Sequence, residues 1–242
     1  MHRLYINTLG MIALGVMLAV SAVSCGGSGN GGSGDSTQGE IVYEVSYPDL
    51  DPNGVLVTML PEELKITFKD KKMKTSFKTA AGILKMDVIS DASTYEMINT
   101  IEIFGTQYAV RIDSSIDYRL GESLGAFEAV TTEEVVEIAG QNVRKVDLFF
   151  DGETEAKTIY VSDDFDVVDP NWATIYGAIQ GMLMEYEIEH YDILMHLKAA
   201  EIRYKEIDDT DFLVSEDCTF MPQDEFDAFV RDNLKILLED LE

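Results

Sequence analysis

Apolar residues at every second position are the dominant pattern of this chain from Glu40 onward. In the first run, Ile41, Tyr43 and Val45 fall on one side of an extended backbone and the residues between them fall on the other. This is the period of a half-buried β-strand, and its recurrence predicts about a dozen short strands. The further segments with this alternation are 66–68, 73–77, 84–88, 95–97, 101–103, 108–112, 136–138, 146–150, 159–161, 184–188, 195–199 and 202–204.

Short turn segments separate many of these runs, at 70–72, 104–106, 139–141 and 151–153. Such short connections join antiparallel neighbours, whereas parallel neighbours need a long crossover. The predicted fold is therefore mainly β with a few helices (α+β), built as a single curved antiparallel sheet in which successive strands lie side by side.

One break in the alternation predicts a lid helix. A helix N-cap followed by a first-turn proline stands at 169–170. We interpret the segment as a lid whose inner face binds ligand; a helix that only seals the core is the alternative. The apolar residues that recur at helical spacing after the proline are Trp172, Ile175, Tyr176 and Ile179.

A second break, which begins at Pro222, predicts a C-terminal amphipathic helix. Its apolar residues form one stripe along a helix surface, so the helix needs a surface to cover. The residues of the stripe are Phe226, Phe229, Val230, Leu234, Leu237, Leu238 and Leu241.

The first 24 residues are typical of a secretory signal peptide. Arg3 precedes an uncharged apolar run over 9–20, and small residues fill 21–24 directly before Cys25. This arrangement resembles the lipobox of bacterial lipoproteins. In that family the leader is cut before the Cys, the thiol receives a diacylglycerol and the new amine is acylated. The resemblance therefore implies that Cys25 is lipidated and anchors the chain stably in a membrane.

The residues after Cys25 refine the expected location and the domain limits. By the same resemblance, Gly26 lacks the aspartate that retains lipoproteins at the inner membrane, which favours the outer membrane. No acidic cluster occurs before Asp35, which favours the periplasmic face over the cell surface. The predicted parts are a signal peptide (1–24), a lipidated Cys with a flexible Gly/Ser-rich linker (25–39) and a folded domain with a C-terminal helix (40–242).

The charge balance excludes one class of partner. The 242 residues contain 18 Lys and Arg against 45 Asp and Glu, a formal charge of −27. Because nucleic-acid binding depends on neutralising phosphates with basic side chains, no nucleic-acid partner is predicted. Seven lysines nevertheless stand in 65–85, whereas 206–242 holds 13 acids. This lysine-rich hairpin offers a surface for anionic lipid headgroups or an acidic partner; a solvated face paired with the acidic tail is the alternative.

Several apolar residues in the predicted strands are candidates to line a ligand cavity. Methionine is flexible and polarizable, which suits a cavity that accepts varied acyl chains. Ordinary core packing is the alternative interpretation. The candidates outside the lid are Met86, Met97, Met184 and Tyr186.

Motifs for metal, cofactor or catalytic chemistry are weak. His190 and His196 share a side only if one continuous strand carries them, and a third ligand is not evident. The segment 49–54 has the first oxygen positions of a calcium loop, but Leu60 stands where the bidentate acid is required. Neither G-x-S-x-G nor a P-loop occurs. We therefore predict no metal, no cofactor and no enzymatic activity, with a hydrolase as a minor alternative.

The order of these features resembles a family of Gram-negative lipoproteins of unknown function with a LolA-like fold. The resemblance implies an incomplete antiparallel barrel of about eleven strands around an apolar concavity, partly closed by a lid helix. LolA-like proteins use this concavity for lipids or acyl chains, and the family offers no catalytic residues. The matching segments are 39–43, 137–145, 159–165 and 181–184, followed by Phe212 and 220–222, so the resemblance spans roughly residues 39 to 226.

The function predicted from the sequence is that of a non-enzymatic, outer-membrane-anchored lipoprotein that binds a lipid or another apolar ligand in a half-barrel. The alternative is a packed interaction module that docks another envelope protein. The sequence leaves both interpretations open.

Overall fold

The computed structural model describes residues 36–79, 82, 84–112, 127–150 and 155–239, which all belong to one folded unit, 34–242. The predicted signal peptide and the lipidation site Cys25 lie outside the described residues, as does the predicted turn at 151–153.

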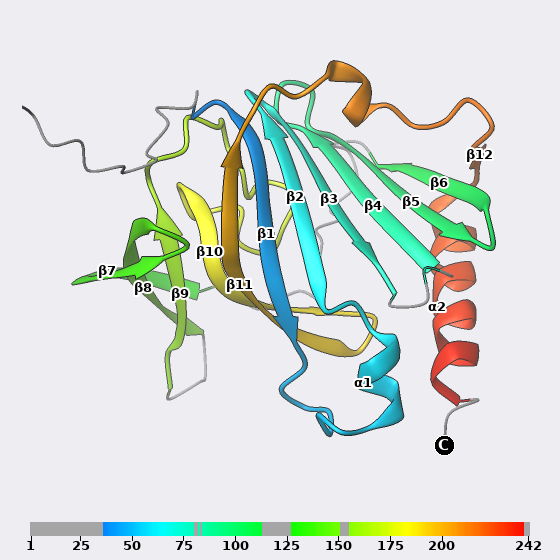
Figure 1. The fold of residues 1–242 in the computed structure, drawn as a ribbon, viewed down its shortest axis with the longest axis horizontal. Helices are drawn as coiled ribbons and strands as arrows, with labels where there is room; N and C mark the ends of the chain where they lie inside the picture. The colour runs from blue at the N-terminus through cyan, green and yellow to red at the C-terminus, as the bar shows by residue number, and fades with distance from the viewer. Residues whose placement is uncertain (1–35, 80–81, 83, 113–126, 151–154, 240–242) are drawn as a thin grey trace, which may run out of the picture. The chain divides into compact units, whose positions relative to one another are not determined.

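Twelve strands form one sheet, in the order β12-β6-β5-β4-β3-β2-β1-β11-β10-β9-β8-β7 (Figure 1). Most neighbours follow one another in the chain, and β1 joins the two halves because it pairs with both β2 and β11. The predicted mainly β fold is confirmed, and the sheet is not closed. The strands are β1 (Gln38–Ser46), β2 (Glu63–Lys69), β3 (Lys72–Lys78), β4 (Leu84–Asp91), β5 (Glu96–Ile103), β6 (Thr106–Ile112), β7 (Phe127–Ile138), β8 (Gln141–Phe150), β9 (Lys157–Ser162), β10 (Met182–His190), β11 (Ile193–Tyr204) and β12 (Thr219–Phe220).

Two details of the predicted sheet were wrong. The sheet is mixed, because the two-residue strand β12 pairs parallel with β6; a strand this short leaves no alternation to detect. Some predicted strands are also parts of longer ones: 195–199 and 202–204 both lie in β11, and β5 contains 101–103 together with most of 95–97.

Tight two-residue turns explain several of the hairpins. Phe104 and Gly105, between β5 and β6, have φ of 48° and 80°, and Ala139 and Gly140, between β7 and β8, have φ of 50° and 76°. Positive φ at both central residues is the geometry of the type I′ turn, whose twist matches that of paired strands. The turns predicted at 104–106 and 139–141 are therefore confirmed.

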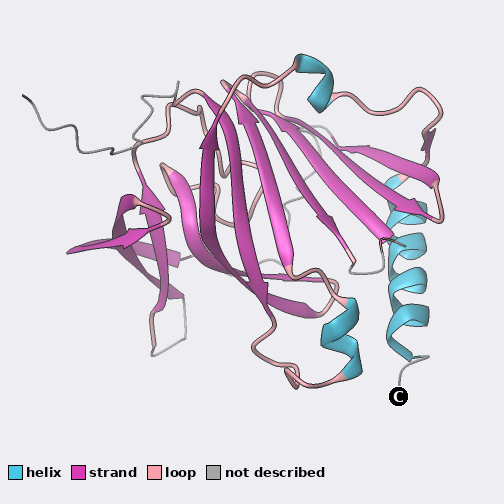
Figure 2. Cartoon of the chain, viewed as in Figure 1, coloured by secondary structure: helices cyan, strands magenta, loops and turns pink. Residues whose placement is uncertain are grey.

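The predicted C-terminal helix is present as α2 (Gln223–Glu239) (Figure 2). Phe226 and Val230 are fully buried, and they pack against a cluster that includes Met86 and Met97. The described part of the apolar stripe, which also includes Phe229 and Leu234, therefore covers the sheet, as predicted. The side chains of Leu237, Leu238 and Leu241 lie outside the described part of the structure. A short helix α1 (Val55–Met59) and a single 3-10 turn η1 (Asp209–Phe212) were not expected from the sequence.

The predicted lid helix does not form. Asp169 has a left-handed φ of 45°, and the chain after Pro170 is a succession of turns without a regular helix. Hydrogen bonds three residues apart replace the helical ladder, as from the Thr174 N–H to the Asn171 carbonyl at 2.9 Å. Helical spacing of apolar residues does not distinguish a helix from a chain of turns that buries the same residues.

Candidate ligand-binding site

One face of the sheet, here called the inner face, carries the apolar side chains that surround the candidate site. The pairing register places Tyr43, Leu64, Phe77, Met86 and Ile101 directly opposite one another on β1 to β5. Cross-strand partners point to the same side of a sheet. The row therefore forms a continuous apolar floor across five strands.

Residues 163–181, which connect β9 to β10 and are here called the covering loop, lie over part of this floor. Asn171 fixes the loop from within, because its Nδ2 donates to the carbonyls of Ile179 and Gly181, both at 2.8 Å. Only 4% of Asn171 is exposed. Since buried amides are stable only when hydrogen-bonded, this residue is a determinant of the loop's shape.

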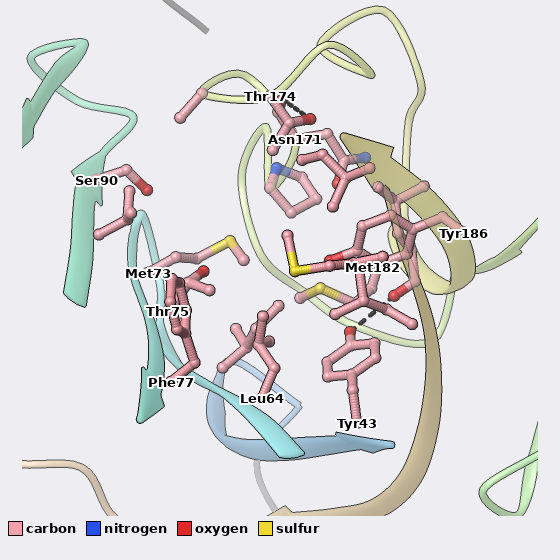
Figure 3. A pocket seen from close by; sticks show the side chains of 18 of the residues that line it. Tyr43, Leu64, Met73, Thr75, Phe77, Ser90, Asn171, Thr174, Met182 and Tyr186 are labelled. Atoms are coloured by element: carbon pink, nitrogen blue, oxygen red, sulfur yellow. Dashed lines mark hydrogen bonds between the residues drawn. The ribbon is translucent and has the colours of Figure 1, made fainter. Parts of the chain in front are cut away.

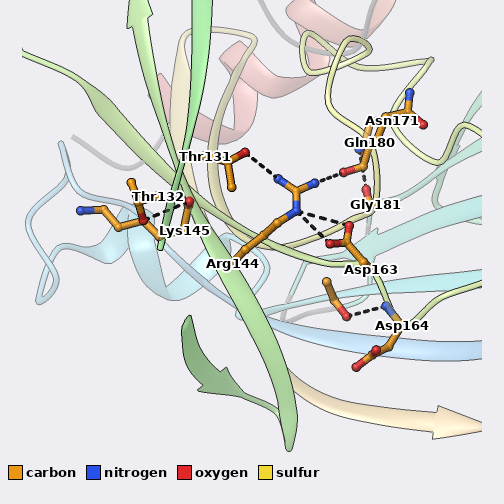
Figure 4. Close-up of polar contacts among 10 residues, drawn as sticks. Thr131, Thr132, Arg144, Lys145, Asp163, Asp164, Asn171, Gln180 and Gly181 are labelled. Atoms are coloured by element: carbon orange, nitrogen blue, oxygen red, sulfur yellow. Dashed lines mark hydrogen bonds and ion pairs between the residues drawn. The ribbon is translucent and has the colours of Figure 1, made fainter. Parts of the chain in front are cut away.

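Arg144 of β8 holds the end of the covering loop from outside (Figure 4). Its Nη2 donates to the Gln180 carbonyl at 2.6 Å, and its Nε donates to the Asp163 carboxylate at 3.0 Å. Gly181 follows with a φ of 92°, and a Cβ there would lie 2.7 Å from the Ser162 carbonyl oxygen. The Arg144 guanidinium and Gly181 thus fix the point where the loop enters β10.

Three tyrosines make contact where the covering loop, which contributes Tyr176, meets β1 and β10. The ring of Tyr186 makes edge contacts with Tyr43, at 6.1 Å between centroids, and with Tyr176, at 5.8 Å. The Tyr43 hydroxyl donates to the Leu183 carbonyl at 2.7 Å, and the Tyr176 hydroxyl donates to the Glu187 carbonyl. Burial raises the pKa of all three phenols well above the ordinary value, so they remain neutral at physiological pH and act as hydrogen-bonded apolar surface.

Two adjoining cavities remain between the inner face and the elements that cover it. The first has a volume of about 50 Å³ and lies between the inner face, the covering loop and β10 (Figure 3). The second, also of about 50 Å³, lies toward α2 and includes Met86 and Leu234 in its lining. Phe77, His190 and Met195 line both cavities, and these three shared side chains are here called the partition.

The described lining of both cavities carries no Asp, Glu, Lys or Arg. Its one group that titrates near neutrality is His190, and burial, with a contribution from the positive charge of Arg231, lowers the pKa of His190 to about 4. The imidazole is therefore neutral at pH 7. The space is suited to uncharged, largely apolar matter and lacks the paired acids or bases that a hydrolytic site needs.

The predicted ligand-binding residues divide into lining and packing positions. Tyr186 lines the first cavity and Met86 the second. Trp172 packs beside Ala173 and stacks edge-on with Tyr95 at 5.4 Å. The residues buried in the hydrophobic clusters without lining either cavity are Met97, Ile175, Tyr176, Ile179 and Met184.

The covering loop reaches the first cavity through residues other than the predicted ones, namely Pro170, Asn171, Ala173 and Thr174. These residues were not predicted, because a helix at this position would present a different set of residues to the sheet. Phe77 and Met195 appeared only as members of alternating runs. No local signal marked them as the partition, because the partition brings together residues of β3 and β11, which are far apart in the sequence.

The opposite face of the sheet carries the predicted lysine-rich surface. Lys65, Lys74, Lys78 and Lys85 line an open groove of about 650 Å³ together with Arg203 and three glutamates. Most of these lysines have acidic partners: Lys65 pairs with Glu40 at 2.9 Å, and Lys74 and Lys85 approach Asp87 at 3.4 and 3.7 Å. Within the described part of the chain, Lys78 forms no ion pair.

The two histidines do not share a strand. His190 ends β10 and His196 lies in β11, with a hairpin turn at Tyr191 and Asp192 between them. His196 contacts Glu185 at 3.1 Å, whereas His190 lines the cavities. Among the described residues no group of three or more His, Cys, Asp or Glu is placed to hold a metal ion.

Within the described ranges, no helix is both long and apolar enough to cross a membrane.

Comparison with known proteins identifies no family. No family model matches the chain, and no curated protein matches it. A solved structure of PNGF-II matches with a TM-score of 0.47 and 11% sequence identity, over 80% of this chain and 33% of that one. The chain thus spans about a third of the length of that protein, and a likeness this low carries no argument about function.

Proposed function

We propose that this protein is a non-enzymatic lipoprotein, anchored in the outer membrane through acylated Cys25, whose domain binds a lipid or another apolar ligand. In this proposal the sheet is a LolA-like half-barrel, and the ligand lies between its inner face and the covering loop. The leader and the lipobox-like Ser24-Cys25 support the anchor. The periplasmic face of the membrane is the proposed location.

The observation that carries the ligand proposal is the pair of adjoining apolar cavities that share Phe77, His190 and Met195. Native interiors are close-packed and have few voids larger than a water molecule. Each cavity has room for roughly three to five water molecules. A methylene group that enters such a space gains about 0.8 kcal/mol, so the end of an acyl chain would bind favourably.

A longer ligand requires local movement, because most of the inner face is already covered by its own side chains. Met195 and Phe77 are the side chains to displace, and both are only partly buried. Methionine has three rotatable bonds and changes rotamer at little cost. The proposal therefore places the adjustable part of the site at the partition, and the fixed part at the loop held by Asn171 and Arg144.

The direct test is mass spectrometry of organic extracts from residues 36–242, expressed without the anchor and purified gently. We expect an aliphatic molecule in stoichiometric amount. The matched control is the Met195→Trp variant, whose larger side chain fills the partition and should lower the recovered amount severalfold. A well-folded wild-type domain that carries nothing, and that binds no apolar dye, would contradict the proposal.

The anchor is tested separately in the full chain. Wild type should incorporate radiolabelled palmitate and fractionate with outer membranes, and Cys25→Ser should lose both properties. Label that persists in Cys25→Ser would contradict this part of the proposal. Loss of the anchor leaves the ligand test unaffected, since residue 25 precedes the folded unit.

A packed interaction module is the second candidate function. The groove of about 650 Å³ on the lysine-rich face favours it, because Lys78 in its lining forms no ion pair among the described residues and can bind an acidic group. Chemical cross-linking in intact cells, followed by pull-down, separates the two candidates. If the protein is an interaction module, the pull-down should recover a stoichiometric acidic protein from wild type and not from Lys78→Glu. The control is Lys71→Glu, because Lys71 is exposed and lies outside the groove lining.

A further inference from the structure

The first cavity has a polar side. Thr75 of β3 and Ser90 of β4 lie at one side of its lining, across from Asn171 and Thr174 of the covering loop (Figure 3). Met73 pairs with Ser90 and Thr75 pairs with Val88, so Thr75 and Ser90 are diagonal neighbours on the inner face. Their side chains thus face the same otherwise apolar space from neighbouring strands.

These two hydroxyls are available to a ligand. Thr174 is already engaged, because its hydroxyl donates to the Asn171 carbonyl at 2.9 Å and accepts from the Tyr176 N–H at 3.1 Å. The Nδ2 of Asn171 is likewise committed to two carbonyls. Within the described residues, by contrast, the side chains of Thr75 and Ser90 have no hydrogen-bond partner in the protein. Each can both donate and accept.

Among the described residues that line the two cavities, no side chain carries a positive charge at neutral pH. The described lining of the two cavities contains no Lys or Arg, and His190 is uncharged at neutral pH. The Arg231 guanidinium, whose charge acts on His190, is outside the lining, largely exposed, and paired with Asp192 at 3.5 Å. A carboxylate that entered the cavity would lose its hydration and gain no opposite charge, which is strongly unfavourable.

We propose that the site selects aliphatic chains with a neutral hydroxyl-bearing head, such as a fatty alcohol or a monoacylglycerol, over fatty-acid anions, and that Thr75 and Ser90 hydrogen-bond the head. This inference rests on the proposed function and specifies its ligand. The chain lies toward Met182 and the Phe77 partition, and the head lies beside the two hydroxyls.

The test is displacement of an apolar fluorescent dye from residues 36–242 at pH 8 by three probes: octan-1-ol, octanoate and benzene. Octan-1-ol should displace the dye at a concentration at least about tenfold lower than octanoate. The Thr75→Val/Ser90→Ala variant should bind octan-1-ol with about tenfold lower affinity, the value expected for two lost neutral hydrogen bonds. Its affinity for benzene should stay within about twofold, because benzene makes no hydrogen bond there.

The control is Ser76→Ala, which removes a hydroxyl from the groove lining on the opposite face of β3. This variant should leave the affinity for each of the three probes unchanged. Benzene reports on the proposed function, because an apolar cavity binds it whatever the polar groups do. Octanoate that binds as tightly as octan-1-ol, or octan-1-ol that is unaffected in the double variant, would overturn the neutral-head inference alone. If none of the probes displaces the dye, the proposed function fails and the inference fails with it.

Discussion

The glycine where the covering loop enters β10 offers the sharpest test of the loop's construction. Gly181 has a φ of 92°, and a Cβ would meet the Ser162 carbonyl oxygen at 2.7 Å, with Asp163 and Val161 side-chain atoms at 2.8 Å. Gly140 has a comparable φ of 76°, but a Cβ there would have nothing within 4 Å. Alanine substitutions at the two positions therefore separate the cost of the backbone conformation from the cost of the contact.

The magnitudes follow from these two terms. Positive φ destabilises an alanine by roughly 1–2 kcal/mol. Replacing glycine also lowers the conformational entropy of the unfolded chain, which stabilises the folded state by roughly 0.4–1 kcal/mol. Gly140→Ala should thus lower the free energy of unfolding by about 1 kcal/mol or less. Gly181→Ala adds overpacking against backbone, roughly 1–3 kcal/mol, for a total of about 2–4 kcal/mol.

Urea denaturation followed by circular dichroism gives both free energies, and thermal melting gives a second measure. For a domain of this size each kcal/mol corresponds to about 2–4 °C in Tm, so Gly181→Ala should melt roughly 4–16 °C lower than wild type. Hydrogen exchange over 169–180 should rise in Gly181→Ala and stay unchanged in Gly140→Ala. Equal losses of stability in the two variants would refute the reasoning, since only Gly181 is crowded.

Three further predictions concern groups in the covering loop or beside it. Asn171→Ala leaves two carbonyls without their donor and should lower the free energy of unfolding by about 2–4 kcal/mol, measured in urea. Tyr43→Phe removes the donor to the Leu183 carbonyl and should cost about 1–3 kcal/mol in the same assay. Folding lowers the pKa of His190 from 6.5 to about 4. The neutral imidazole therefore favours the folded state above pH 6.5, and this contribution, at most about 3 kcal/mol, should be lost as the pH falls toward 4. The His190→Gln variant should not show this loss.

Matched variants control these measurements. Asn53→Ala, in an exposed turn, and Tyr95→Phe, whose hydroxyl makes a 3.3 Å contact with Asp169 at the surface, should each change stability by less than about 0.5 kcal/mol. For the histidine, the quantity to compare is the difference in stability between wild type and His190→Gln from pH 4 to 8, which removes the contribution of the carboxylates. A difference that does not change with pH would contradict the assigned cause, and so would a wild type that gains stability relative to His190→Gln on acidification.

The sheet was predictable because strand periodicity is a local property. A run such as 41–45 exposes one face and buries the other whatever its neighbours are, so the alternation survives in the sequence. Glycine at 105 and 140 marked the hairpin turns for the same reason, since positive φ favours that residue. The stripe of α2 was equally local, and Phe226 and Val230 are buried as it implied.

The covering loop was not predictable in this way. Apolar residues at 172, 175, 176 and 179 are consistent with a helix, but long-range contacts decided the outcome. Asn171 bonds carbonyls eight and ten residues ahead, and Arg144 approaches from another strand. Local propensity is a weak prior that such tertiary contacts override.

The sequence by itself determined the strands, the hairpins, the C-terminal helix and the charge that disfavours nucleic acid, because each depends on residues close together in the chain. Only the tertiary structure decided which side chains border the cavities. Thr75, Ser90, Phe77 and His190 come from β3, β4 and β10, and they meet only because β1 joins the first half of the sheet to the second. Cavities arise where packing between distant elements is incomplete, and no local pattern of residues records where that happens.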